Sequence, residues 1–212
     1  MRAGYPRSWV LKRAIDLGVC IVLLPILLAV MLLVSALIVL DSPGAPIFVQ
    51  DRIGLRGKRF RIYKFRTMVK NHKTDDERKY MQKYITGKIQ PESATLHKPT
   101  QPHHITRLGR ILRKTSLDEL PQILNVLRGE MSLIGPRPNV SWEVDSYLGW
   151  HYERLNALPG ITGLAQVMGR SAISFDQIVR FDILYVRQQG LSLDIWIAWR
   201  TLKTVFSGRG AG

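Results

Sequence analysis

The fold of this chain turns on one uncharged stretch, Leu17–Leu40, which reads LGVCIVLLPILLAVMLLVSALIVL. About 20 apolar residues suffice for a helix to cross a bilayer, so the stretch is long enough. A helix that crosses a bilayer usually keeps its excess of Lys and Arg on one side. Here basic residues stand on both flanks: Arg2, Arg7, Lys12 and Arg13 before the stretch, and Arg52, Arg56, Lys58, Arg59, Arg61, Lys64 and Arg66 after it. This symmetry predicts a segment that enters and leaves the membrane by the same, cytoplasmic face.

Pro25 lies inside the apolar stretch. Proline removes a backbone donor and clashes with the preceding turn, so we expect the helix to bend or break there and to turn back. An ordinary single-pass helix that tolerates its proline is the alternative. A cleaved signal peptide fits less well, because its apolar region usually has about 7–15 residues and because Asp41-Ser42-Pro43-Gly44 reads as a turn.

The length of the chain limits the number of its domains, and its charge limits the kind of partner. Its 212 residues allow one domain beside the membrane segment, and we divide it into residues 1–41, the re-entrant membrane helix with its basic flank, and residues 42–212, a membrane-associated domain. Lys and Arg outnumber Asp and Glu by 31 to 16, which gives a formal net charge of +15. Such a charge predicts an anionic partner: nucleic acid, lipid headgroups or a phosphorylated substrate. The single cysteine, Cys20, fits a reducing compartment.

A β-hairpin is predicted after the turn. Residues 47–54 and 58–66 flank Leu55-Arg56-Gly57, and the second run alternates basic with apolar or aromatic residues. Alternation would bury Phe60 and Ile62 on one face, with a slip in the pattern near Lys64. A solvated basic face is the simpler interpretation of the same run.

The densest group of charged and special residues lies between Arg107 and Pro138. Four cations recur at helical spacing, which predicts one stripe along a helix: Arg107, Arg110, Arg113 and Lys114. Ser116 and Glu119 then fit a capping box for a second helix, for which Gly129 is a plausible stop. On this interpretation the acidic pair Asp118 and Glu119 only complements the dipole of the helix.

The same residues also suit phosphate chemistry. The positive end of a helix beside several cations binds phosphate, and arginines together with Mg²⁺ would offset the repulsion between a carboxylate and a diphosphate. Asp118 could then attack phosphorus, since carboxylates act as nucleophiles in phosphoryl transfer. Arg137 stands between Pro136 and Pro138, whose fixed φ angles give its backbone little freedom and suit it to anion recognition.

A C-terminal helix is predicted over residues 191–203, where Trp and basic residues alternate with apolar positions at helical spacing. This pattern fits a helix that lies in the membrane interface. A core helix that buries Trp196 and Trp199 fits the pattern equally well.

Several ordered segments resemble one known family, the bacterial sugar transferases or monotopic phosphoglycosyl transferases. They cover nearly the whole chain: Ser42–Gly44, Gln50–Gly54, Lys64–Met68, Ser116–Gln122, Asn125–Leu127, Met131–Pro138 and Pro159–Gln166. The resemblance implies transfer of a sugar phosphate from a UDP-sugar to a polyprenyl phosphate such as undecaprenyl phosphate, with release of UMP. It also implies a re-entrant helix broken at Pro25. The serine that often precedes that proline in the family is Leu24 here.

The resemblance also implies roles for individual residues. Asp118 matches the nucleophile that forms a phosphosugar-enzyme intermediate, and Glu119 matches the residue associated with Mg²⁺. The base, if one is needed, stays open, because a phosphate monoester with a second pKa of about 6 is already mostly a dianion at neutral pH. Matches to the substrate-binding positions are Lys64, Arg66, Arg113, Arg137, Arg170 and Asp194.

Together these observations predict an α-rich mixed α/β fold. We expect a re-entrant helix, a small β-hairpin and amphipathic interfacial helices around a catalytic domain on the cytoplasmic face of the bacterial inner membrane. The expected partners are a UDP-sugar, a polyprenyl phosphate and membrane lipid, without nucleic acid. Glucose or galactose is the expected sugar, and a homo-oligomer is left open. A non-enzymatic, basic membrane-anchored adaptor for anionic lipid or nucleic acid is the alternative.

Overall fold

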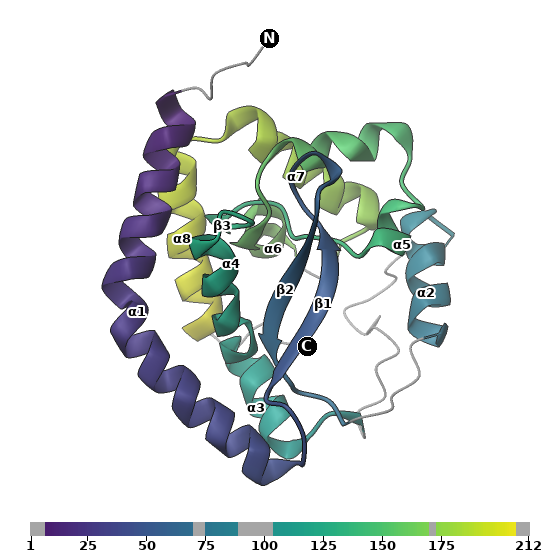
Figure 1. Cartoon of the computed structure of the whole chain (residues 1–212). Helices are drawn as coiled ribbons and strands as arrows, with labels where there is room; N and C mark the ends of the chain where they lie inside the picture. Colours follow the sequence, from purple (N-terminus) through teal and green to yellow (C-terminus); the bar gives the residue numbers. More distant parts are fainter. Residues whose placement is uncertain (1–6, 70–74, 89–103, 170–172, 207–212) are drawn as a thin grey trace.

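The computed structural model describes residues 7–69, 75–88, 104–169 and 173–206. Its first element is the 35-residue helix α1 (Arg7–Asp41), which curves along one side of the molecule (Figure 1). By length and composition this helix is able to cross a membrane, and its most apolar window is only 11% buried. Pro25 lies inside α1, which continues through it without dividing into two helices. Re-entrance into a bilayer stays a prediction.

Both ends of α1 are fastened to the same domain. Near its start, the Lys12 ammonium lies 2.8 Å from a carboxylate oxygen of Asp194, and Asp16 accepts a hydrogen bond of 2.7 Å from the Ser132 hydroxyl. Just beyond its end, the Arg66 guanidinium donates to the carbonyl of Ser42 at 2.6 Å and to that of Pro43 at 2.8 Å. Between these ends, Cys20, Val34 and Ile38 are buried against the domain, so α1 packs on it along much of its length.

The predicted β-hairpin is confirmed. Strand β1 (Ile47–Ile53) pairs antiparallel with β2 (Arg59–Phe65), and a single 3-10 turn, η1 (Leu55–Gly57), joins them. Phe60 and Ile62 are buried against the core while Arg59 and Arg61 are exposed. The alternation slips at Lys64, as the sequence indicated, because Lys64 is half-buried and Phe65 packs into a different cluster with Leu112.

The region after the hairpin contains helix α3 (Arg107–Thr115) as predicted, but the capping box is wrong. Ser116 has a left-handed backbone (φ 57°) and makes no side-chain cap. It leads into a 3-10 helix, η3 (Leu117–Gln122), and then a short α-helix, α4 (Ile123–Leu127), which Gly129 follows with φ 79°. Pro121 lies inside η3. The Glu119 carboxylate binds cationic side chains, which form stronger, charge-assisted hydrogen bonds than the backbone amide of a capping box would.

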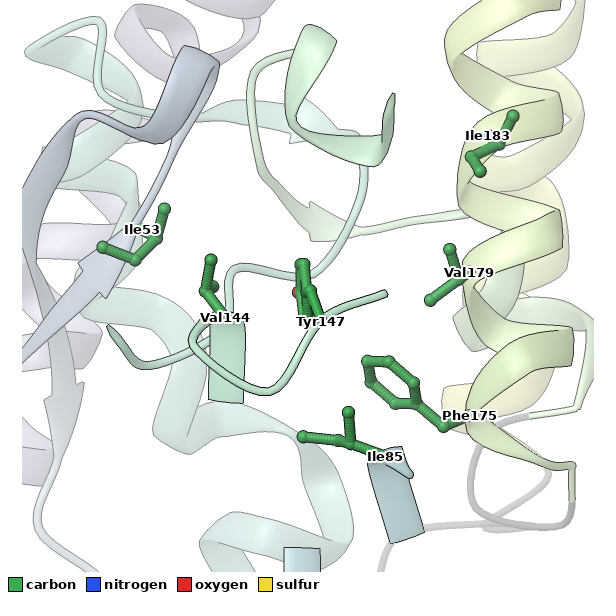
Figure 2. Packing of buried hydrophobic residues seen from close by; sticks show 7 residues of the cluster. All are labelled: Ile53, Ile85, Val144, Tyr147, Phe175, Val179 and Ile183. Carbon is green, nitrogen blue, oxygen red and sulfur yellow. The ribbon is translucent and has the colours of Figure 1, made fainter. Parts of the chain in front are cut away.

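Short elements complete the domain. A second, parallel pair of strands joins β3 (Ser132–Ile134) to β4 (Gly160–Thr162). The other short elements of this part of the chain are α5 (Ser141–Val144), the 3-10 helix η4 (Gly149–Asn156) and α6 (Leu164–Met168), followed by the longer α7 (Phe175–Gln188). One core cluster packs the end of β1 and helix α2 (Asp75–Ile85) against α5 and α7 (Figure 2). It consists of Ile53, Ile85, Val144, Tyr147, Phe175, Val179 and Ile183.

The last helix, α8 (Leu191–Phe206), has one buried and one exposed face. Ile197 is fully buried, whereas Trp196 is 39% and Trp199 is 57% exposed. Arg200 lies over the ring of Trp196 and Lys203 over that of Trp199. The interpretation as a core helix with two buried tryptophans is therefore wrong, and the exposed Trp and basic residues favour an interfacial helix.

Candidate active site

The acidic pair lies where η3 meets the hairpin. The left-handed turn at Ser116 ends α3, so that Asp118 and Glu119 come directly after it in the first turn of η3. On β2, Lys64 extends its ammonium to Glu119 Oε1 at 2.8 Å. Arg137 reaches the same oxygen with one guanidinium nitrogen at 3.0 Å. Three segments far apart in the sequence thus meet at one carboxylate.

These two cations keep Glu119 ionised. Burial alone would raise the pKa of Glu119, but Arg137 and Lys64 outweigh it and lower the pKa to about 2. The pKa of Lys64 is also shifted. Burial and the nearby Arg137 lower it to about 8, although Glu119 acts to raise it.

Asp118 has a different environment from its neighbour. Burial raises its pKa, and so does the charge of Glu119, while Lys64, Arg137 and Arg113 offset part of this. The two adjacent carboxyl groups are therefore driven in opposite directions, which is typical of paired acids with separate tasks. Glu119 is a fixed anion, whereas the negative charge of Asp118 is less stabilised by its surroundings.

The loop that carries Arg137 is held closely by its neighbours. Gly135 donates from its amide to the Thr162 carbonyl at 2.9 Å, and the Gly160 amide donates to the Pro136 carbonyl at 2.9 Å. A Cβ atom on Gly135 would lie 2.2 Å from the Leu158 carbonyl oxygen, so only glycine permits this approach. The backbone around Arg137 is thus fixed by hydrogen bonds and by close packing.

Two residues that the sequence analysis did not single out support this arrangement. Asn125 is fully buried; it accepts a hydrogen bond from the Tyr63 amide at 3.2 Å and donates to the Arg61 carbonyl at 2.6 Å, which joins α4 to β2 beside Lys64. Arg52 donates to the Pro138 carbonyl at 3.0 Å. The available signal for Asn125 was a lone amide within the apolar run of residues 123–127.

Lys64 and Arg137 thus lie against the carboxylate of Glu119, next to Asp118. The chain matches the model of the bacterial sugar transferase family over residues 7–208. The chain belongs to this family.

Its relatives are transferases of several bacteria. Over 201 residues it is 39% identical to a UDP-galactose-lipid carrier transferase of Erwinia amylovora, covering 95% of this chain and 41% of that protein. Over 207 residues it is 35% identical to a UDP-N-acetylgalactosamine-undecaprenyl-phosphate N-acetylgalactosaminephosphotransferase of Aeromonas hydrophila, covering 95% and 45%. Over 208 residues it is 36% identical to the exopolysaccharide production protein ExoY of Sinorhizobium fredii, covering 97% and 90%. The chain thus spans less than half of the first two relatives and most of the third.

The predicted site residues fall into three groups. Asp118, Glu119, Lys64, Arg113 and Arg137 come together, and Arg113 also donates to the Thr67 hydroxyl at 3.0 Å. The other three cations of the α3 stripe are exposed.

Two predicted substrate-binding residues make other contacts. Arg66 holds the turn after α1. Asp194 pairs with Lys12, and the Tyr185 hydroxyl lies 2.9 Å from its other carboxylate oxygen. Arg170 lies outside the described residues.

The dyad is compatible with a Mg²⁺ ion shared with a diphosphate. Within the described parts of the chain, no three His, Cys, Asp or Glu side chains gather into a preformed ion site. Mg²⁺ commonly binds through one or two carboxylates and completes its shell with waters and substrate phosphates. Both ion pairs of Glu119 use Oε1, so its other oxygen and the adjacent Asp118 are the ligands that fit.

Proposed function

We propose that the protein transfers a sugar-1-phosphate from a UDP-sugar to undecaprenyl phosphate or a similar polyprenyl phosphate, releasing UMP and forming a polyprenyl-diphosphate-sugar. The observation that carries this proposal is the Asp118–Glu119 dyad, in which Lys64 and Arg137 neutralise Glu119 while Asp118 keeps a raised pKa. Cations and a reactive carboxylate meet at one place, which is what attack on a diphosphate requires.

In the first step, an Asp118 carboxylate oxygen attacks the phosphorus that bears the sugar. The bond from this phosphorus to the bridging oxygen breaks, UMP leaves with that oxygen, and a phosphosugar-aspartate remains. Arg137 and Arg113 are the side chains suited to neutralise the charge on the transferred phosphoryl group. Glu119, with Asp118, would hold Mg²⁺, which supplies further positive charge against the diphosphate when bound.

In the second step, a phosphate oxygen of the polyprenyl phosphate attacks the same phosphorus. The bond between phosphorus and the Asp118 oxygen breaks, and the carboxylate is regenerated. The acceptor needs no strong base, because a phosphate monoester with a second pKa of about 6 is mostly a dianion at neutral pH. The sugar keeps its bond to the phosphate throughout.

The acceptor places this reaction at a membrane, and the proposal extends to how the protein meets it. We infer that α1 enters and leaves the cytoplasmic leaflet of the bacterial inner membrane by the same face. Both ends of α1 bond to one polar domain, and several of its middle side chains are widely exposed, for example Val22 at 75% and Leu32 at 72%. A spanning helix would have to separate these two ends.

The expected sugar is a hexose such as glucose or galactose, and the expected role is the first membrane step in making an exopolysaccharide, O-antigen or other glycoconjugate. In support, the Erwinia relative is named for UDP-galactose and the Sinorhizobium relative for exopolysaccharide production. The Aeromonas relative is named for N-acetylgalactosamine, so the donor panel must include amino sugars.

The test is UMP release by the purified protein in a membrane mimetic with undecaprenyl phosphate, Mg²⁺ and a panel of UDP-sugars. We expect release that depends on the acceptor for one donor, and a loss of at least about 1,000-fold in the Asp118→Asn variant, because the nucleophile is gone. Release of no UMP from folded protein, together with binding of anionic lipid that Asp118→Asn leaves intact, would favour a non-enzymatic adaptor.

A further inference from the structure

A buried ion pair contacts the backbone of the loop that carries Arg137. Arg154 on η4 and Asp182 on α7 form a salt bridge, and each side chain is only 2% exposed. Neither residue contacts Glu119 in the described structure. The reaction proposed above makes no use of them.

The two terminal guanidinium nitrogens of Arg154 also bind the loop. One guanidinium nitrogen donates to the backbone carbonyl of Arg137 at 3.0 Å, in addition to its bond with Asp182. The other donates to the Asn139 side-chain oxygen at 3.0 Å and to the Tyr147 hydroxyl at 2.7 Å. A single side chain thus fixes both ends of the segment from Arg137 to Asn139.

The middle of that segment is held by a second arginine. Arg52 donates to the Pro138 carbonyl at 3.0 Å, and the Ile53 amide donates to the Asn139 carbonyl at 2.8 Å. Each of the three residues from Arg137 to Asn139 is therefore bonded to the scaffold, while the Arg137 side chain stays free to reach Glu119. Such anchoring lets a long side chain keep one position without losing its contact with solvent and substrate.

A buried ion pair is a costly way to stabilise a fold, since well-packed apolar residues of similar size often serve as well or better. The fork of donors on an arginine, however, can bind several acceptors in fixed directions, which neither lysine nor an apolar residue can do. Asp182 keeps this fork charged and oriented. The retained charges therefore point to a need for geometry at the Arg137 loop rather than for stability.

We propose that Arg154, oriented by Asp182, is a positioning residue that fixes the backbone of Arg137 so that its guanidinium meets Glu119 and the diphosphate of the donor. This inference rests on the proposed function. It assigns the pair a part in transition-state binding, so its loss lowers kcat/KM while the protein stays folded.

The decisive variant replaces both charges by apolar residues, Arg154→Met with Asp182→Leu, which leaves no buried charge unpaired. We expect kcat/KM for the UDP-sugar to fall about 100-fold, since small misplacements of a catalytic group have effects of that size, with the melting temperature near that of the parent. The matched control is Arg187→Met with Glu153→Leu, because that exposed ion pair joins the same two elements, η4 and α7. We expect it to stay within about twofold of the parent.

A double-mutant cycle tests whether the effect passes through Arg137. If it does, adding the apolar pair to Arg137→Ala costs less than about threefold further, because coupled residues are not additive. Parental kcat/KM in the folded apolar variant would overturn the proposal, and so would a fully additive loss in the Arg137→Ala background. If the apolar variant does not fold, the Arg154→Lys variant takes its place. A lysine can still pair with Asp182 but leaves the Arg137 carbonyl without its donor. The proposal requires the same fall in kcat/KM from this variant.

A readout without catalysis separates this inference from the proposed function. Hydrogen exchange of the peptide covering residues 134–140 should be faster in the apolar variant than in the parent and in the control. Unchanged exchange contradicts the positioning role even if the parent is active. If the parent releases no UMP from any donor but exchange still rises, the proposed reaction fails and the structural part of the inference stands.

Discussion

At the scale of residues, one carboxylate oxygen organises the site. Glu119 Oε1 forms ion pairs with both Lys64 and Arg137, and these keep Glu119 ionised. The adjacent Asp118 has a raised pKa. The pKa values of two chemically similar neighbours thus shift in opposite directions, because Glu119 is paired with two cations.

Lys64 gives this arrangement an upper pH limit. Its pKa is lowered to about 8, chiefly by burial and by Arg137, so Lys64 is charged below that pH and loses its charge as the pH rises through it. We expect kcat/KM to fall towards about tenfold per pH unit above about 8, measured by UMP release from pH 6 to 10. In the Lys64→Arg variant the positive charge persists, because the arginine pKa is above about 12. We expect the fall in kcat/KM above pH 8 to disappear in this variant. The same decline near pH 8 in a folded Lys64→Arg variant would contradict the role given to Lys64.

Sequence patterns predicted the dyad and Arg137, and the family resemblance predicted Lys64, but neither predicted that Lys64 and Arg137 both pair with Glu119. Spacing predicted a stripe of four cations on one helix, and Arg113 is the residue of that stripe whose charge lowers the pKa of Asp118. One partner of Glu119 is Lys64, which lies 55 residues earlier in the chain. Local periodicity shows which residues share a helix face but carries no information on which strand packs against it.

At the scale of elements, the long helix and the hairpin were predictable, and the short elements were not. Apolar composition sufficed for α1, and alternation with a turn sufficed for β1 and β2. The prediction for the segment after α3 was wrong. Ser116 and Glu119 have the spacing of a capping box, but Ser116 has a left-handed backbone and the segment, which contains Pro121, forms a 3-10 helix. The tertiary ion pairs of Glu119 outweigh the local capping preference there.

The arrangement of α1 predicts that both of its flanks lie on one side of the membrane. The test uses Cys20→Ser protein carrying either Val10→Cys, at a position 58% exposed before the apolar stretch, or Arg56→Cys at the exposed hairpin turn. Membrane-impermeant maleimide added to intact spheroplasts should label neither site, and both should react after permeabilisation. Labelling of Val10→Cys from outside, with Arg56→Cys protected, would instead establish a helix that crosses the membrane.

At the scale of the whole molecule, the long apolar helix α1 is part of the scaffold that holds the candidate active site. Helix α8 lies beside α1 (Figure 1), joined to it through Asp194 and Lys12, and Asp16 of α1 bonds to Ser132 on β3. Strand β3 leads directly into the loop that carries Arg137. Asp194, predicted from the resemblance as a substrate-binding residue, thus joins the membrane helix to the domain in this structure.

The proposed reaction depends most on Asp118 as a nucleophile, and the mass of the intact protein reports whether Asp118 takes up the sugar phosphate. Purified protein is incubated with its UDP-sugar and Mg²⁺ but without acceptor, then denatured and weighed. We expect a fraction of the parent to gain the mass of one sugar phosphate, to lose it when undecaprenyl phosphate is added, and to show no gain as Asp118→Asn. An active parent that never gains this mass, or an equal gain by Asp118→Asn, would contradict the central claim.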